Sequence, residues 1–363
     1  MENGRVPLAR NYDVVVVGGG PAGAATARAL KGQGLKVVIL EMKKLPRYKM
    51  CSGILFPGAL RTLSGIYGGV PEEVLSHPSR CRGLRVFVDK ESPMMEMPAD
   101  LIDPERGSAD SGLSVRRGDF DSWLCKESGT DLVDGCVFHD FREHGDDFTL
   151  KVEMDATYTE LKTRYLVGAD GCISRVRRIA FPGFDRKLRL IPNYEEWYLG
   201  TADLEPEWLY MFCDRSVTGF FATLFRKENH WIAVTGVQRG ESVKDFHQRL
   251  IEYLKQKHGF HVEQREKSCG IVLHDMSATG SFCLGRGNVL LVGEAAGLNR
   301  CAEGITSALL SGTAAGECII ESMRSGEKAF QFYSRAIESE IQTIRSVNGL
   351  IEKALGYNPF TRE

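Results

Sequence analysis

The sequence predicts an α/β protein in which one domain is assembled from separated segments and a second, sheet-rich domain is inserted between them. A complete strand–turn–helix–strand unit fits within residues 13–41. Two further strands, each followed by a glycine-containing turn, end near residues 170 and 293. The sequence between these signals has the short alternating runs typical of strands. Because nucleotide-type signals recur at such distances, we expect the three segments that carry them to assemble one domain.

The composition is that of an ordinary globular chain and excludes several classes of protein. Of the 363 residues, 43% are hydrophobic, and 46 Lys and Arg stand against 48 Asp and Glu, giving a net charge of −2. This balance leaves no electrostatic footprint for a nucleic acid. The ten cysteines form no C-x-x-C pair, and no Cys/His group has zinc spacing, so we predict reduced thiols and no metal site.

The sequence also bears on location. Residues 1–12 lack the apolar stretch of a signal peptide, and no run reaches the roughly 18 apolar residues of a membrane-spanning helix. We therefore expect a cytoplasmic protein. Peripheral membrane association and the oligomeric state stay open.

The pattern of apolar residues predicts the elements in chain order. A β-branched strand covers 13–17, a helix covers 22–30, and a second buried strand covers 36–40 and ends at Glu41. In the first half of the chain we further expect an irregular segment at 43–71, a strand at 83–89, a loop or an edge excursion at 91–111, a helix at 118–128, a β-meander within 135–166 and a strand at 165–169. In the second half we expect aromatic strands at 210–212, 220–225 and 231–237, a helix at 243–257, a strand at 288–292, a helix within 295–316 and a helical tail at 329–355.

The turn at 18–23 reads G-x-G-x-x-G and carries a dinucleotide-binding pattern. Gly18 permits the tight turn, Gly20 lets the backbone approach a pyrophosphate, and Gly23 allows the helix to pack closely on the strand. The helix that opens at Pro21 and Ala22 presents N–H groups to the phosphates. Glu41 stands where a carboxylate accepts hydrogen bonds from ribose hydroxyls. The segment is therefore interpreted as a dinucleotide site rather than a mere turn.

Three other segments decide which dinucleotide is bound. They are G-A-D-G-C-I-S-R-V-R-R at 168–178, V-G-E-A-A-G at 292–297 with E-G-I at 303–305, and R-G-D-F-D at 117–121 with a leucine at 124. In this order they resemble the FAD-dependent superfamily that includes para-hydroxybenzoate hydroxylase and the geranylgeranyl reductases. The stretch P-R-Y-K-M-C-S-G at 46–53 is similar to a signature of the geranylgeranyl reductase family.

The resemblance implies FAD as cofactor and a role for each matching residue. The first glycines and Glu41 would hold the adenosine half, Arg117 would reach the pyrophosphate, and residues from 293 onward would lie near the flavin ring. The cofactor-binding residues implied are Gly18, Gly20, Pro21, Ala22, Gly23, Glu41, Met50, Cys51, Ser52, Arg117, Asp170, Gly171, Gly293, Glu294, Ala295, Gly297, Gly304 and Ile305.

Cys51 is also the candidate catalytic residue. In the reductase family its loop lies beside the flavin, where a thiol would give a proton to the carbon opposite the hydride acceptor. A cysteine has a pKa near 8.5 when unperturbed and is protonated at neutral pH, as a donor must be. The alternative is that Cys51 is a small packing residue under the cofactor.

The other assignments have structural alternatives too. Asp170 and Gly171 would form an ordinary turn, and Arg117 would make a surface ion pair with Asp119 or Asp121. Gly293 and Gly297 would serve helix packing alone, and Tyr48 and Lys49 would be plain loop residues. The aromatic residues of 194–197, 210–212 and 220–225 would belong to the core of a sheet instead of lining an apolar substrate cavity.

Some residues depart from the family pattern. Glu294 stands where the family has Asp, and the loop at 299–302 is shorter than usual. The segment 219–225 keeps only the outline of the family's aromatic Y-x-W-x-F-P signature, and the W-x-W-x-I-P stretch of flavin-dependent halogenases is missing around Ile191 and Pro192.

The resemblance implies a three-layer Rossmann-like FAD-binding domain, an inserted mixed β-sheet substrate domain and a C-terminal helical tail. The boundaries we predict are 1–80, 110–185 and 285–330 for the FAD domain, 81–109 and 186–284 for the substrate domain, and 331–363 for the tail.

The function implied is reduction of carbon–carbon double bonds in an apolar, isoprenoid-like substrate by hydride from reduced flavin. The sequence holds one dinucleotide pattern, so NAD(P)H would dock transiently as electron donor, or another donor would serve. The alternatives are a single-component aromatic monooxygenase and a flavin-binding sensor without turnover.

Overall fold

The computed structural model describes residues 8–89, 92–99, 111–300 and 303–355. Its centre is a six-stranded sheet with the order β18-β19-β12-β1-β2-β8, in which all neighbours are parallel except β18 and β19. The strands are β1 Val14–Val17, β2 Val37–Glu41, β8 Asp131–Asp134, β12 Tyr165–Gly168, β18 Gly285–Arg286 and β19 Val289–Leu291.

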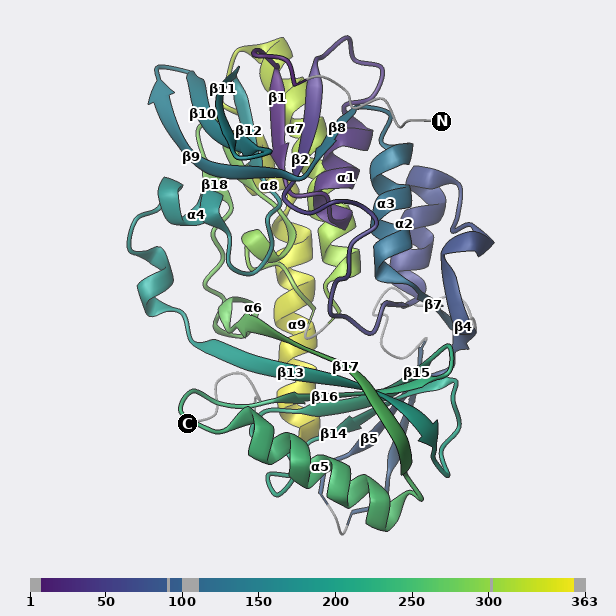
Figure 1. Cartoon of the computed structure of the whole chain (residues 1–363). Coiled ribbons are helices and arrows are strands. Elements are labelled where there is room, and N and C mark those ends of the chain that lie inside the picture. The colour runs from purple at the N-terminus through teal and green to yellow at the C-terminus, as the bar shows by residue number, and fades with distance from the viewer. Residues whose placement is uncertain (1–7, 90–91, 100–110, 301–302, 356–363) are drawn as a thin grey trace.

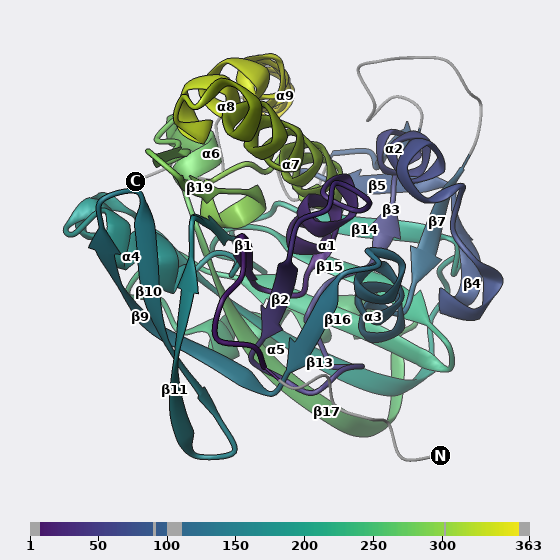
Figure 2. The same ribbon diagram turned by 90° about the horizontal axis from the view of Figure 1, so that it is seen from above.

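This sheet is covered on both faces. Every residue of β1 and β2 is buried, which explains why both read as continuous apolar runs rather than as alternating strands. Figure 2 shows helices α1 (Pro21–Ala29) and α7 (Ile305–Ser325) on one side of β1 and β2. On the other side lies a meander of β9 (Cys136–His144), β10 and β11. The two coverings and the sheet form three layers.

A seven-stranded mixed sheet lies beyond the carboxyl ends of this central sheet (Figure 1). Its order is β17-β13-β16-β15-β14-β5-β6, and the helix α5 (Val243–Lys257) packs on its outer face. Its strands are β5 Gly83–Phe87, β6 Met95–Pro98, β13 Leu190–Thr201, β14 Trp208–Phe212, β15 Ala222–Lys227, β16 His230–Gly236 and β17 His261–His274.

The remaining elements connect or flank the two sheets. The long helix α9 runs past both parts of the molecule in Figure 1, from the level of the central sheet to that of the seven-stranded sheet. The strands outside the lists above are β3 Ile54–Leu55, β4 Leu75–Cys81, β7 Gly112–Val115, β10 Asp147–Met154 and β11 Thr157–Thr163. The α-helices not yet given are α2 Pro57–Tyr67, α3 Arg117–Glu127, α4 Arg175–Ala180, α6 Met276–Thr279, α8 Ala329–Ala336 and α9 Glu338–Leu355.

The predicted α/β class is confirmed, and so are most strongly periodic elements. Helix α5 has the predicted bounds, and its buried Leu250 and Leu254 belong to the predicted apolar face. The meander at 136–163 is also where the alternation places it. Within the described residues no helix is long and apolar enough to cross a bilayer.

Two predictions about elements are wrong. The segment 43–71, predicted to be irregular, contains helix α2, which begins at a proline in its first turn and ends at Gly68 in the left-handed conformation. The helix predicted within 295–316 begins only at Ile305, because Gly297 has a φ of +84° and interrupts the backbone after a short turn of 3₁₀ helix. For the segment 91–111 the structure shows the edge excursion, because β6 is the outermost strand of the seven-stranded sheet; residues 91 and 100–110 lie outside the described part.

Candidate active site

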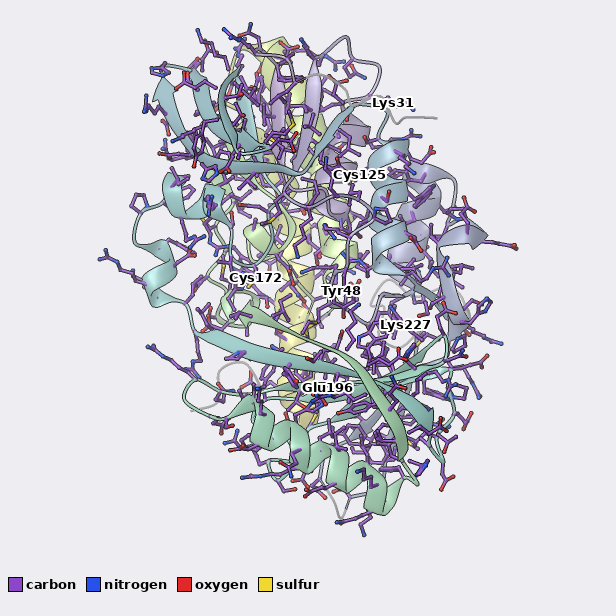
Figure 3. The ribbon with its side chains drawn as sticks, in the orientation of Figure 1. Lys31, Tyr48, Cys125, Cys172, Glu196 and Lys227 are labelled. Atoms are coloured by element: carbon purple, nitrogen blue, oxygen red, sulfur yellow. The ribbon has the colours of Figure 1, made fainter. Side chains whose placement is uncertain are left out.

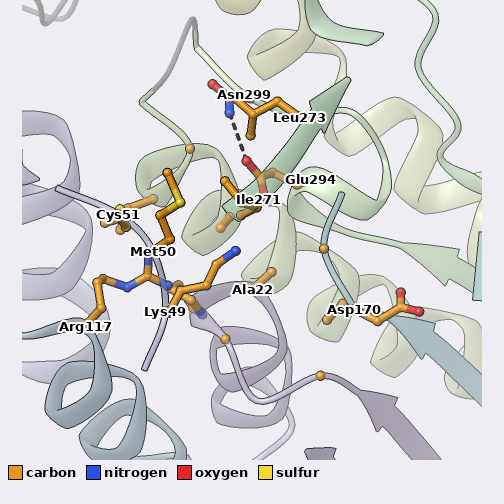
Figure 4. A pocket seen from close by; sticks show the side chains of 18 of the residues that line it. Ala22, Lys49, Met50, Cys51, Arg117, Asp170, Ile271, Leu273, Glu294 and Asn299 are labelled. Atoms are coloured by element: carbon orange, nitrogen blue, oxygen red, sulfur yellow. Dashed lines mark hydrogen bonds between the residues drawn. The ribbon is translucent and has the colours of Figure 1, made fainter. Parts of the chain in front are cut away.

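A cavity of about 690 Å³ lies between the two large sheets (Figure 4). One wall is made by Val17, Glu41, Ala169 and Val292, which stand at or just beyond the carboxyl ends of β1, β2, β12 and β19. The opposite wall comes from the seven-stranded sheet. Open α/β sheets bind their ligands at this end of the parallel strands. The volume is in the range of small-molecule and cofactor sites.

The glycine-rich turn faces this cavity and leaves room for a ligand there. Gly18 has a φ of +113°, and a Cβ on it would lie 2.3 Å from the carbonyl oxygen of Ala169. A Cβ on Gly23 would lie 2.0 Å from the carbonyl oxygen of Gly18. A Cβ on Gly20 would instead project into open space, with the guanidinium of Arg47 as nearest group at 4.0 Å. Gly18 and Gly23 therefore allow the close backbone contacts within the turn, and Gly20 leaves space for a ligand.

Glu41 sits at the end of β2 and is held by three contacts. Its carboxylate accepts a hydrogen bond of 3.0 Å from the N–H of Gly19 and another of 3.0 Å from the N–H of Lys43. The guanidinium of Arg47 lies 3.1 Å from the same carboxylate. Glu41 is buried and lines the cavity, so its position is fixed where the dinucleotide pattern needs a hydrogen-bond acceptor.

Arg117 is buried at the start of α3 and points toward the loop that carries Met50 and Cys51 (Figure 4). It makes two hydrogen bonds of 3.0 Å to Asp121, whose carboxylate also binds Arg47 at 2.9 Å. The ion pair considered as an alternative is therefore present. It is buried at the cavity wall rather than on the surface, and Asp119 pairs with Arg116 instead.

Asp170 and Gly171 line the cavity with their backbone. The Asp170 carboxylate accepts hydrogen bonds from the hydroxyl of Ser174 at 2.5 Å and from the N–H groups of Arg175 and Val176 at 2.6 and 3.1 Å. Burial raises the pKa of Asp170, and these hydrogen bonds oppose that rise. The side chain thus holds the start of α4 and fixes the turn beside the cavity.

Arg177, quoted in a motif but given no role by the sequence, links two walls of the cavity. It is 1% exposed and donates to the carbonyl oxygens of Cys172 and Ala295, each at 2.8 Å. It also pairs with both oxygens of Asp185 at 2.8 and 2.9 Å. One guanidinium therefore fastens the turn after β12 to the turn after β19.

The segment from 293 to 305 forms another part of the wall. Glu294 accepts a hydrogen bond of 3.2 Å from the Asn299 amide nitrogen, and both side chains line the cavity (Figure 4). The Asn299 amide oxygen is buried and has no hydrogen-bond partner within the described part of the chain. Buried polar atoms in proteins are almost always paired, so this oxygen fits a donor supplied by a ligand.

The predicted binding residues divide into two groups. One group does not line the cavity: Gly23, Gly293, Ala295 and Gly297. A Cβ on Gly293 would lie 3.1 Å from the Cβ of Ala22, and a Cβ on Gly297 would lie 2.7 Å from the Cβ of Met276. These contacts fit the alternative in which the two glycines serve packing. The residues that do line it are Gly18, Gly20, Pro21, Ala22, Glu41, Met50, Cys51, Ser52, Arg117, Asp170, Gly171, Glu294, Gly304 and Ile305.

A buried ion pair ties helix α9 to the loop that bears Asn299. The Arg300 guanidinium donates to Glu340 at 2.8 Å and makes a second, shorter contact, and the Ser307 hydroxyl donates to the same carboxylate at 2.6 Å. Arg300 and Glu340 are 7% and 5% exposed.

Replacing Glu340 with glutamine is expected to lower the free energy of unfolding by about 3 kcal/mol, because it removes the negative partner of a buried guanidinium. FAD affinity should fall as well, since the loop at 298–300 loses its anchor. Chemical denaturation and flavin titration measure the two effects. The exposed Glu338 on the same helix is the control, and Glu338→Gln should change stability by less than about 0.5 kcal/mol. Equal effects of the two variants would contradict this account.

The sequence reasoning missed two ionisable side chains near the substrate end: Glu195, which lines the cavity, and Lys227, which lies against Gly53 beside the loop of Cys51. Glu195 on β13 is 1% exposed and lines the cavity, whereas its neighbour Glu196 points to the other face and lies 3.4 Å from His247 on α5. Glu195 accepts hydrogen bonds from Trp197 at 2.7 Å and from the hydroxyl of Tyr48. Burial raises the pKa of Glu195.

The second missed residue is Lys227, the last residue of β15. It is 5% exposed, and its ammonium donates a hydrogen bond of 2.9 Å to the carbonyl oxygen of Val115 on β7. Burial lowers the pKa of Lys227 to about 8. One signal in the sequence could have found Lys227. It lies two residues after Phe225 in the same strand, so the two side chains share one face of that strand.

The wall contributed by the seven-stranded sheet is mostly apolar. Of the predicted aromatic strands, Phe221 and Phe225 line the cavity, while Tyr210 and Phe212 are buried in the core between this sheet and α5. The two alternatives are thus each right for part of these strands. The other apolar residues of this wall include Leu84, Leu209, Met211, Val234, Ile271 and Leu273.

The residues present fit a bound dinucleotide. The glycine turn is open at Gly20, an acceptor stands at Glu41, and the unpaired oxygen of Asn299 lies farther along the same cavity. Nothing in the described part suggests a metal centre, since no group of three or more His, Cys, Asp or Glu side chains is arranged to hold an ion.

The fold and this cavity define a flavoprotein of the FAD-binding class. The chain belongs to the FAD-binding domain family, whose model matches residues 11–305, and FAD is its cofactor. The resemblance predicted from the motifs is confirmed. Protein CbrA of Escherichia coli (strain K12) is 27% identical over 316 residues, which cover 82% of this chain and 81% of that protein.

Solved structures share the fold. A geranylgeranyl bacteriochlorophyll reductase-like protein (Ta0516) of Thermoplasma acidophilum has a TM-score of 0.72 and 19% identity, covering 95% of this chain and 84% of its own. The p-nitrophenol 4-monooxygenase PnpA of Pseudomonas putida DLL-E4 has a TM-score of 0.68 and 15% identity, covering 98% and 91%. At these identities the likeness concerns the fold alone.

Proposed function

We propose that this protein is an FAD-dependent reductase of carbon–carbon double bonds in an apolar, isoprenoid-like substrate, with Cys51 as the proton donor. The observation that carries the proposal is the position of Cys51. It lines the cavity that the glycine turn opens into, opposite the apolar wall of the seven-stranded sheet. Bound FAD, once reduced, supplies hydride for such a reaction, and NAD(P)H or another donor reduces it.

The protein's own groups have separable tasks in this reaction. The apolar wall binds the hydrocarbon and excludes water from the double bond. Glu195 and Tyr48 form a polar end to that wall, and Arg117 packs beside the loop that carries Cys51. The Cys51 thiol then stands in the cavity as an acid that reaches a substrate carbon.

Replacing Cys51 with alanine is expected to leave the FAD content and flavin absorbance unchanged, and to slow anaerobic alkene reduction by roughly 10²–10⁴-fold, as for loss of a general acid. Product formation from a four-isoprene prenyl alcohol, followed by mass spectrometry, measures the effect. Cys318→Ala is the control, because this thiol belongs to α7 and is not in the cavity wall. Normal turnover by Cys51→Ala would show that the proton comes from elsewhere.

A further inference from the structure

Lys227 is a buried cation without a carboxylate at ion-pair distance among the described residues. Within the part of the chain that the structure describes, no carboxylate lies within ion-pair distance of its ammonium, and its recorded hydrogen bond goes to the neutral carbonyl of Val115. Burying an ammonium is costly unless an anion or strong acceptors compensate. The carboxylates that act on it, Glu195 and Glu228, do so from a longer distance.

The thiol of Cys51 is a group beside Lys227 that is able to supply an anion. The N–H of Gly53 donates to the Cys51 sulfur at 3.3 Å, and a Cβ on Gly53 would lie 2.6 Å from the Lys227 ammonium nitrogen. The loop that carries Cys51 therefore passes directly against Lys227. Figure 3 shows Lys227 in the zone between the two large sheets, where Tyr48 of the same loop also lies.

A second cation faces the same sulfur. The positive charge of Arg117 acts on the Cys51 sulfur while the guanidinium stays paired with Asp121. One backbone N–H of the loop donates to the sulfur, and the charges of a guanidinium on α3 and of an ammonium on β15 act on it. Hydrogen-bond donors and cations arranged in this way favour a thiolate over a thiol.

The effects on ionisation are reciprocal. Burial raises the pKa of the Cys51 thiol, but Arg117, Lys227 and the N–H of Gly53 together lower it by more, so the pKa falls below its ordinary value. Burial lowers the pKa of Lys227, Arg117 lowers it further, and Cys51, Glu195 and Glu228 raise it.

We propose that Lys227 is a positioning residue for the reaction, which stabilises the thiolate that Cys51 becomes when it gives up its proton. This inference rests on the proposed function for its chemical purpose. In the step, the S–H bond of Cys51 breaks, its proton forms a C–H bond on the substrate, and the electron pair stays on sulfur beside Lys227 and Arg117. The two electrons that reduce the double bond come with the hydride of the proposed reaction. Water reprotonates the thiolate after the product leaves the cavity.

The test is the rate at which iodoacetamide alkylates Cys51 in the FAD-loaded protein as a function of pH, read at the Cys51 peptide by mass spectrometry. Only the thiolate reacts, so the rate rises as the pH passes the pKa of Cys51. For the wild-type protein we expect a midpoint below the 8.5 of a free cysteine. A wild-type midpoint at or above that value would overturn the proposal, whether or not any variant folds.

Lys227→Met should move the midpoint upward by about one pH unit, and so slow alkylation at pH 7 about tenfold. Lys227→Arg keeps the charge and should keep the low midpoint. Lys267→Met is the matched control, because that lysine lies in the same sheet with its ammonium over the rings of Tyr48 and Trp197. An unchanged midpoint in Lys227→Met, with normal flavin absorbance, would contradict the proposal.

Turnover separates this inference from the proposed function. The thiol is the donor, so alkene reduction should fall with rising pH at the midpoint where alkylation rises, and both midpoints should shift together in Lys227→Met. If alkylation shifts while the protein reduces no alkene, the Lys227–Cys51 interaction stands and the proposed function fails. If alkene reduction occurs without any shift in Lys227→Met, the proposed function stands and the role of Lys227 fails.

Discussion

Replacing Gly18 with alanine is expected to abolish FAD binding and to lower the free energy of unfolding by roughly 3 kcal/mol. The positive φ of this residue alone costs an alanine on the order of 1–3 kcal/mol. In addition, the new Cβ would lie 2.3 Å from the carbonyl oxygen of Ala169, so the turn after β1 must move away from the turn after β12. Both turns line the cavity, and a shift between them changes its shape. Flavin titration and urea denaturation measure the two effects.

Gly32 provides the matched control for this prediction. It also has a positive φ, +78°, but a Cβ there would have no atom within 4 Å. Gly32→Ala should therefore show the conformational cost alone, about 1 kcal/mol, with full FAD binding. If Gly18→Ala behaved like Gly32→Ala, the close approach of the two turns would not matter for binding.

Replacing Arg177 with methionine is expected to cost about 3–5 kcal/mol of stability and to weaken FAD binding at least tenfold. The change leaves the Asp185 carboxylate without its buried partner and removes the donors to the carbonyl oxygens of Cys172 and Ala295. Because those oxygens belong to the turns after β12 and β19, the cavity wall loosens where FAD binds. Denaturation midpoints and flavin affinity are the measurements.

The neighbouring Arg178 is exposed and makes its recorded contacts with carbonyl oxygens of its own helix start. Arg178→Met should thus change the free energy of unfolding by less than about 0.5 kcal/mol. It is a control for stability alone, because Arg178 also lines the cavity. A large loss in Arg178→Met, or none in Arg177→Met, would show that the buried guanidinium does not hold the two turns together.

Features that depend on local periodicity could be predicted from the sequence. The apolar runs of β1 and β2, the glycine turn between them and the amphipathic face of α5 all follow from residues close together in the chain. The same holds for most of the residues that line the first wall of the cavity, because the dinucleotide pattern binds a ligand with backbone groups at fixed spacing.

The substrate end could not be predicted in the same way. Glu195 lines the cavity and Lys227 lies against the loop of Cys51, both from strands far from the glycine turn in sequence. Which face of a strand meets the cavity depends on sheet pairing. The pair Glu195 and Glu196 illustrates this, since one side chain faces the cavity and the other faces α5. Likewise, the unpaired oxygen of Asn299 is recognisable only once its surroundings are known.

The domain boundaries stay a prediction. The central sheet takes its strands from 14–41, 131–168 and 285–291, and the seven-stranded sheet takes its strands from 83–98 and 190–274. Limited proteolysis at the connections near residues 110 and 186 would show whether these sets of segments are separate folding units.

The measurement that tests the account most directly is a strictly anaerobic reaction of the reduced protein with an isoprenoid alkene. A reductase needs no oxygen, so we expect the flavin absorbance to return when the alkene is added and the product to carry two more hydrogens than the substrate. A protein that is reoxidised only when oxygen is admitted, and that leaves every alkene unchanged until then, would contradict the proposed reduction and favour oxygen-dependent chemistry in the same cavity.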